Sequence, residues 1–249
     1  SPPCFAHTPP KIGVAHGGVF FFPPVFSPRG GGGGGAGKPP GMGRTPGTPP
    51  SLPGPRPGIV WPVRIDPAGI TGPTRGQARS ARWRGAGWGF HVPASVDGTR
   101  VEQRIVEAAT KLGPHGCVTG WAALQWCGGS WFTGERADGT PREVWLDLDV
   151  GKARPSPGVR MTEEALCRAW VTQVDGLRVA VPAWAALTEM RFARTLERAV
   201  VAADMAAYDD LASRAEIDAM IQLAWARTGI AQARAACALM SENAWSPAE

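Results

Sequence analysis

The chain has 249 residues and a formal net charge of +5, and its length allows one or two domains. The excess of positive charge lies in residues 1–60, which hold five basic side chains and no acidic one. Residues 61–249 carry 21 basic and 21 acidic side chains, which excludes a uniformly basic nucleic-acid-binding protein. Residues 61–100 carry six basic and two acidic side chains, whereas residues 101–249 carry 15 and 19. Any contact with phosphate is therefore expected in residues 61–100.

The N-terminal part of the sequence, residues 1–58, is predicted to be a disordered tail. Residues 1–60 contain 15 Pro and 15 Gly, and such a stretch buries too little apolar surface to offset the entropy of ordering it. Its apolar run VFFFPPVF, residues 19–26, is too short to span a bilayer and lacks the layout of a signal peptide. We interpret the tail as upstream sequence translated from a misplaced start, with a true linker as the alternative.

The five cysteines are interpreted as small buried hydrophobic residues. They form no CxxC or Cys/His pair with the spacing of a metal site. An odd number of cysteines without a signal peptide favours a reducing, cytoplasmic location, and no membrane partner is expected. The cysteines are Cys4, Cys117, Cys127, Cys167 and Cys237.

Residues 59–97 are predicted to form a basic segment made of a short helix and a hairpin. The sequence TRGQ, which starts at Thr74, has the spacing of a capping box and predicts a turn or two of helix. Strand-forming aromatic residues then flank Gly85 and Gly87. Residues 82–94 are therefore expected to be a β-hairpin with its turn at these two glycines.

Residues 98–190 are predicted to form a mixed α+β core. Apolar residues recur at helical spacing over residues 101–112, and a second, short helix is expected after Thr119, which has the residue type of an N-cap. The alternation in VWLDLDV, residues 144–150, predicts a half-buried strand with Asp147 on its solvent face.

Two turn and helix signals follow the predicted strand. Asp175 and Gly176 have the residue types of a tight hairpin turn. Pro182 suits the first position of the helix that begins there.

Residues 191–249 are predicted to be a helical segment. The apolar pattern runs over residues 196–208, a second capping box at Ser213 opens another helix, and a further helix is expected over residues 230–240. The whole chain is therefore assigned to the α+β class. Its last residues repeat a helix-start signal, with Ser246 as the N-cap, and we interpret this as the beginning of a missing domain.

The acidic residues of LDLDVGK are the sharpest candidate for catalysis. Restriction-type nucleases hold a metal with an Asp and a (Asp/Glu)-x-Lys pair, but in this sequence two residues separate Asp149 from Lys152. The favoured interpretation is a solvated strand face, and no nucleotide-binding or nucleophile motif occurs elsewhere. The sequence therefore predicts no catalytic residue, metal ligand, cofactor or small-molecule substrate in this chain.

The basic segment is the candidate DNA-binding site. Arginines on a short helix and a hairpin neutralise phosphates, while the aromatic residues pack underneath or stack. The alternative is an ordinary basic surface whose tryptophans belong to the core. The candidate residues are Arg75, Arg79, Arg82, Arg84 and Trp83.

Several short motifs, in this order, resemble the N-terminal region of actinobacterial proteins with AbiEi-type antitoxin-like modules. The motifs are TRGQA (74–78), RWRGAGWGFHVPA (82–94), VTGWAALQWCGG (118–129) and VDGLRVAVPAWAAL (174–187). In that family a winged helix-turn-helix carries the first two motifs. Many members continue into a very-short-patch-repair-like (Vsr-like) endonuclease domain, and WSPAE (245–249) is similar to the start of its first helix.

The resemblance implies a reduced winged helix followed by an AbiEi-like core, and a nuclease domain that is missing after Glu249. Mg²⁺ would belong only to that missing domain. The expected function is a non-catalytic, DNA-associated module related to toxin–antitoxin regulators, with DNA as the partner and the oligomeric state left open. The alternatives are a free-standing antitoxin-like transcriptional regulator, a protein-interaction domain without a nucleic-acid role, and a metal nuclease on Asp147 and Asp149.

Overall fold

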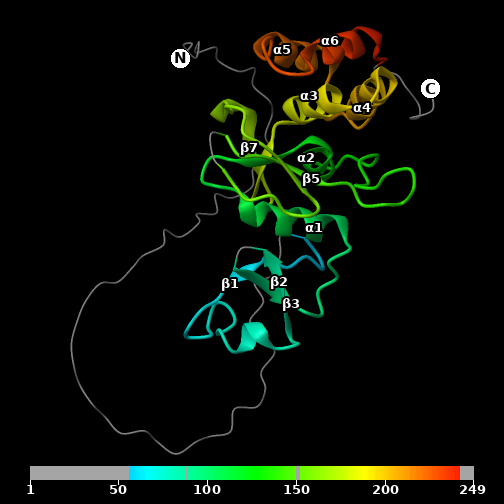
Figure 1. Cartoon of the computed structure of the whole chain (residues 1–249). Helices are drawn as coiled ribbons and strands as arrows, with labels where there is room; N and C mark the ends of the chain where they lie inside the picture. Colours follow the sequence, from blue (N-terminus) through cyan, green and yellow to red (C-terminus); the bar gives the residue numbers. More distant parts are fainter. Residues whose placement is uncertain (1–55, 88, 150–151, 242–249) are drawn as a thin grey trace, which may run out of the picture. The chain divides into compact units, whose positions relative to one another are not determined.

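The computed structural model describes residues 56–87, 89–149 and 152–241 (Figure 1). Nearly all of the predicted tail, Trp88 and the helix-start signal at Ser246 lie outside these residues. The described chain contains six α-helices and two β-sheets, which confirms a mixed α and β fold.

The described residues form α-helices, short 3-10 helices and β-strands. The α-helices are α1 (Val101–Ala108), α2 (Gly120–Trp126), α3 (Pro182–Phe192), α4 (Leu196–Tyr208), α5 (Arg214–Leu223) and α6 (Ile230–Leu239). The 3-10 helices are η1 (Gln77–Arg79), η2 (Ala109–Lys111) and η3 (Arg168–Trp170). The strands are β1 (Val63–Arg64), β2 (Trp83–Gly87), β3 (Phe90–Pro93), β4 (Cys117–Thr119), β5 (Val144–Asp147), β6 (Val159–Thr162), β7 (Val171–Val174) and β8 (Leu177–Ala180).

The smaller sheet is antiparallel, with strand order β1-β3-β2, and contains the predicted hairpin. The turn was expected at Gly85 and Gly87, and this placement is wrong, because both glycines lie within β2. The pairing of β2 with β3 shifts between these two residues, and Gly87 has φ +99°. The glycines therefore form an irregularity in the strand, where an L-residue at Gly87 would be strained.

The capping box that starts at Thr74 is confirmed by two reciprocal hydrogen bonds. The Thr74 N–H donates to Gln77 Oε1 at 2.8 Å, and the Gln77 N–H donates to Thr74 Oγ1 at 3.3 Å. The helix that follows is a single 3-10 turn, within the predicted one or two turns, and it ends because Ser80 returns to extended backbone and its N–H bonds to the Gln77 carbonyl.

The larger sheet has the order β6-β5-β4-β8-β7 and is mixed, with parallel pairs β5–β6 and β4–β8. The predicted hairpin at Asp175 and Gly176 is confirmed: φ is +47° and +78° at these residues, which suits a tight turn between β7 and β8. Strands β4 and β6 were not predicted. The three residues of β4 are too few to show a period, whereas the apolar–polar alternation of Val159–Thr162 in β6 was an available signal.

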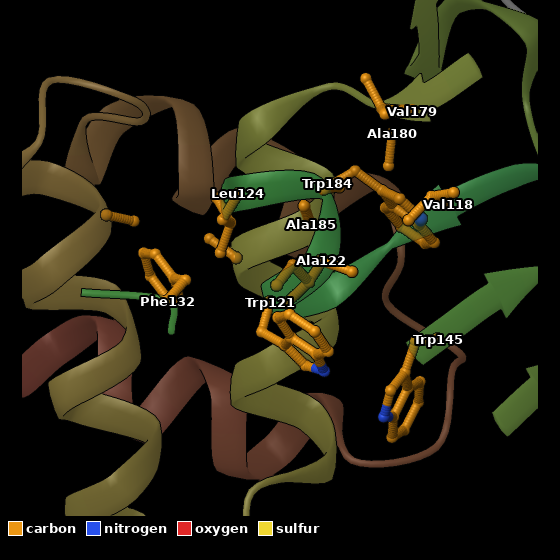
Figure 2. Packing of buried hydrophobic residues seen from close by; sticks show 14 of the residues in the cluster. Val118, Trp121, Ala122, Leu124, Phe132, Trp145, Val179, Ala180, Trp184 and Ala185 are labelled. Carbon is orange, nitrogen blue, oxygen red and sulfur yellow. The ribbon is translucent and has the colours of Figure 1, made fainter. Parts of the chain in front are cut away.

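Helix α3 lies at the centre of the helical part and contacts α2, α4, α5 and α6. Pro182 occupies its first turn as expected, and eight of its 11 residues are buried. Figure 2 shows Trp184 and Ala185 of α3 packed near Trp121, Ala122 and Leu124 of α2. This helix therefore joins the sheet to the C-terminal helices through one continuous apolar core.

The prediction of a half-buried β5 is wrong, because all four residues of the strand are buried. Hydrogen bonding to β4 on one side and β6 on the other makes it an interior strand. The Trp145 ring lies 4.7 Å from that of Phe192, and Asp147 on the same face is only 2 % exposed. The face that alternation assigned to solvent is therefore covered by other side chains.

Thr119 occupies the N-cap position of α2, but its hydroxyl does not cap the helix. Instead, Thr119 Oγ1 lies 3.2 Å from Thr188 Oγ1 of α3, within hydrogen-bond distance. The Ser213 capping box of α5 is complete. Over the ranges that the structure describes, we find no helix with the length and apolar character that crossing a membrane requires.

Candidate nucleic-acid interface

Three of the predicted DNA-binding residues, Arg75, Arg79 and Arg82, are exposed and lie within eight consecutive positions of the chain, and we call them the arginine patch. They come from a stretch of backbone coiled by successive turns: Ala78 N–H donates to Thr74 O at 2.9 Å, and Trp83 N–H donates to Ser80 O at 3.2 Å. Between the described residues, no ion pair or hydrogen bond involves their guanidinium groups. The patch therefore presents three positive charges to solvent from one compact coil.

The acidic residue in the loop before the patch, Asp66, is used by its own loop. Its carboxylate accepts hydrogen bonds from the N–H groups of Ala68, Ile70 and Thr71, each at 2.9 Å. These bonds, that from the Thr71 N–H above all, lower the pKa of Asp66 to about 2. Asp66 is thus ionised at neutral pH and folds the loop that precedes the patch.

Trp83 is buried, and its N–H is bonded to the Ser80 carbonyl at the end of the coil. It is 7 % exposed and pairs with Pro93, on the sheet face that also carries Val63 and His91. This burial fits packing underneath a DNA-binding surface, and it fits equally the alternative of an ordinary basic surface whose tryptophans belong to the core. Its ring is unavailable for stacking on a base.

Arg84 points to the opposite sheet face and is not part of the patch. Its Nη1 and Nη2 donate to Glu107 Oε2 and Oε1 at 2.8 and 2.6 Å, and Nη2 also reaches the Val96 carbonyl at 3.3 Å. The hydrogen bonds to Glu107 raise the pKa of Arg84. Arg84 therefore links β2 to α1, and three of the four predicted arginines are exposed without a hydrogen-bond or ion-pair partner among the described residues.

Glu107 is a residue that the sequence analysis missed. It supports the hairpin that carries Arg82 and lies 23 residues after Arg84, so no local pattern joins them. Within α1, Gln103 Nε2 donates to Glu107 Oε1 at 2.9 Å and to the Val60 carbonyl at 3.0 Å. A polar side chain at each of two successive turns of α1 was the available signal, but it is common to most surface helices.

The alternative nuclease residues do not form an open acidic site. Asp147 is buried, and its Oδ1 accepts a hydrogen bond from the Asp149 N–H at 3.2 Å. Asp149 Oδ1 accepts one from the Leu166 N–H at 2.9 Å. Burial raises the pKa of Asp147 to about 6. Across the ranges 56–87, 89–149 and 152–241, no three His, Cys, Asp or Glu side chains gather closely enough to hold a metal ion.

A second charged cluster, also missed from sequence, lies near Asp147. Glu164 accepts hydrogen bonds from Arg191 Nη2 at 2.6 Å and from Arg227 Nη1 at 2.6 Å. Arg191 also donates through Nε to the Thr228 carbonyl at 2.7 Å. Since Thr228 lies between α5 and α6, this cluster anchors their connection to α3 and to the segment after β6.

Comparisons of the chain with protein-family models, curated proteins and solved structures found no match. The assignment of a function therefore depends on the arrangement of the residues described above.

Proposed function

We propose that this chain is a non-catalytic, DNA-associated module whose arginine patch contacts backbone phosphates. The observation that carries the proposal is the exposure of Arg75, Arg79 and Arg82 on one coil, with no hydrogen-bond or ion-pair partner for their guanidinium groups among the described residues. Unpaired guanidinium groups are well suited to phosphate, because they donate several hydrogen bonds in a fixed planar arrangement.

The surroundings of the patch support this role. Trp83, the first residue of β2, is buried, and the Arg84–Glu107 ion pair fixes the hairpin on α1, so the coil that carries the arginines leads into a supported strand. We interpret the β1-β3-β2 sheet with η1 as the reduced winged helix that the AbiEi-type resemblance implies. In this proposal the module belongs to a cytoplasmic, Vsr-like endonuclease-domain protein, and Mg²⁺ belongs to the nuclease domain of that protein.

The test is fluorescence anisotropy with the full chain and a labelled duplex of about 20 base pairs, two helical turns. The patch variant R75A/R79A/R82A is compared with a control, R194A/R198A/R234A. The control removes the same charge from three exposed arginines whose side chains likewise have no hydrogen-bond or ion-pair partner elsewhere in the described chain. Both variants keep every basic residue of positions 1–58, so any binding by that region is common to both.

We expect the patch variant to bind at least about tenfold more weakly than the control at low salt, because three phosphate contacts are lost. Equal weakening of both variants would show that net charge alone matters and would refute the proposal. Circular dichroism spectra that match the wild type are required of both variants, so that a loss of affinity is not a loss of folding.

A further inference from the structure

We infer that the arginine patch binds duplex DNA through phosphates alone, without reading base edges, so that binding is independent of sequence. This inference rests on the proposed function and specifies its ligand: any duplex with the regular phosphate spacing of B-DNA. It follows from three features of the coil that carries the patch.

The first feature is the length of the helical element. Direct readout in the major groove uses a helix or a two-stranded ribbon that lies along the groove with several side chains facing the bases. In the β2–β3 ribbon, Trp83 is buried and Arg84 is paired with Glu107, and the other residues of β2 are Gly and Ala. In this chain η1 has three residues, Gln77–Arg79, and spans roughly 6 Å at about 2 Å per residue. The capping box closes its start and Ser80 closes its end, so the element is not the beginning of a longer helix.

The second feature is that polar side chains able to read bases are already used. Gln77 is the residue type that pairs with adenine, but its Oε1 accepts the hydrogen bond of the Thr74 N–H at 2.8 Å. Ser80 Oγ donates to the Gln77 carbonyl at 2.7 Å. Both groups stabilise the coil itself and would have to break these bonds to contact a base.

The third feature is the freedom of the arginine side chains. A bidentate contact to guanine is favoured when neighbouring groups hold the guanidinium in one orientation, because less side-chain freedom is then lost on binding. Neither a hydrogen bond nor an ion pair holds Arg75, Arg79 or Arg82 within the described ranges, in contrast with Arg84, which Glu107 fixes in a two-point ion pair. Unrestrained guanidinium groups can follow the nearest phosphates on any sequence.

This gives a quantitative expectation for the dependence on salt. Each phosphate contact contributes about 0.9 to the slope of log affinity against log salt, so the patch should contribute about 2.7. Over a fourfold rise in salt, from about 50 to about 200 mM, the patch contribution falls roughly 40-fold. The slope of R75A/R79A/R82A should be smaller than that of the wild type by this amount, and that of R194A/R198A/R234A should be unchanged.

The experiment combines salt titrations on two unrelated duplexes with selection from a pool of randomised duplexes, all of about 20 base pairs. We expect wild-type affinities within about threefold of each other and no enriched sequence, because one base-specific contact alone changes affinity about 5- to 150-fold. An enriched sequence that binds about tenfold tighter, with the preference lost in R75A/R79A/R82A, would overturn the inference and leave the proposed function standing. Wild-type and patch-variant slopes that coincide would refute both.

Discussion

The guanidinium of Arg84 on β2 and the carboxylate of Glu107 on α1 form a two-point ion pair, with distances of 2.8 and 2.6 Å. Glu107 also accepts a hydrogen bond from Gln103, which is fully buried and bonds both the N–H and the carbonyl of Val60. The pair thus links the hairpin to the helix and to the backbone that leads into β1. It explains why one predicted DNA-binding arginine has a structural role.

Arg84→Ala should lower the free energy of unfolding by about 1–3 kcal/mol, because it removes charge-assisted hydrogen bonds at a partly buried site. Chemical denaturation measures the change. Arg82→Ala, two residues earlier and exposed, is the matched control and should change stability by less than about 0.5 kcal/mol. The assignment of these two roles would be wrong if Arg82→Ala were the more destabilising substitution.

Asp147→Asn should stabilise the protein above pH 6. Burial raises the pKa of Asp147 from its ordinary 3.8 to about 6. Between these two pKa values, the folded protein holds a proton that the unfolded chain has already released. The free energy of unfolding of the wild type therefore falls as the pH rises through this range, by up to about 3 kcal/mol. The variant lacks this titration.

Denaturant titrations of wild type and Asp147→Asn at several pH values between about 4 and about 7 measure the difference. The advantage of the variant should be near zero at the acidic end, where the buried carboxyl is protonated, and largest at neutral pH. A variant that is less stable than the wild type at neutral pH would show that the Asp147 carboxylate is stabilised in the fold.

Glu164→Gln should destabilise the protein by about 3 kcal/mol, because it removes the carboxylate that pairs with Arg191, whose side chain is only 1 % exposed. Glu163→Gln removes the same charge one residue earlier, at an exposed side chain, and should change stability by less than about 0.5 kcal/mol. Thermal and chemical denaturation of the two variants compare them directly. Similar losses in both would mean that net charge, and not the cluster, is responsible.

Gly229→Ala should destabilise the connection between α5 and α6 by about 3 kcal/mol or more. Gly229 has φ +78°, and a Cβ at this position would lie 2.2 Å from the Arg191 carbonyl oxygen. Gly139→Ala is the control, because Gly139 has φ +76° but open space around its Cβ position, so only the backbone strain of about 1–2 kcal/mol applies. If the two substitutions had equal effects, the close approach to Arg191 would be irrelevant.

Features set by neighbouring residues in the sequence could be predicted well. Ser213 and Glu216 form the expected capping box, and Asp175 and Gly176 form the expected turn, because these motifs depend on the backbone within a few residues. Helix α4 begins at Leu196 and ends at Tyr208, the range predicted from apolar spacing.

Features set by residues far apart in the sequence could not be predicted. Asp147 was placed on a solvent face because alternation shows only that the two faces of a strand differ, and both faces of β5 are covered. The partner of Arg191 is 27 residues away and that of Arg84 is 23 residues away. The candidate site was therefore found from its charge. The structure was needed to show that Arg84 is paired with Glu107 whereas Arg82 is exposed.

The measurement that tests the central claim most directly is hydrogen–deuterium exchange of the full chain, with and without an excess of duplex DNA. The N–H groups of Ala78, Arg79 and Ser80 are hydrogen-bonded within the coil of the arginine patch, and contact with DNA should slow their exchange further. We predict protection of residues 74–83 on binding, and none at the control arginines Arg194, Arg198 and Arg234. Protection elsewhere in the chain with residues 74–83 unchanged would contradict the claim that the patch is the DNA-contacting surface.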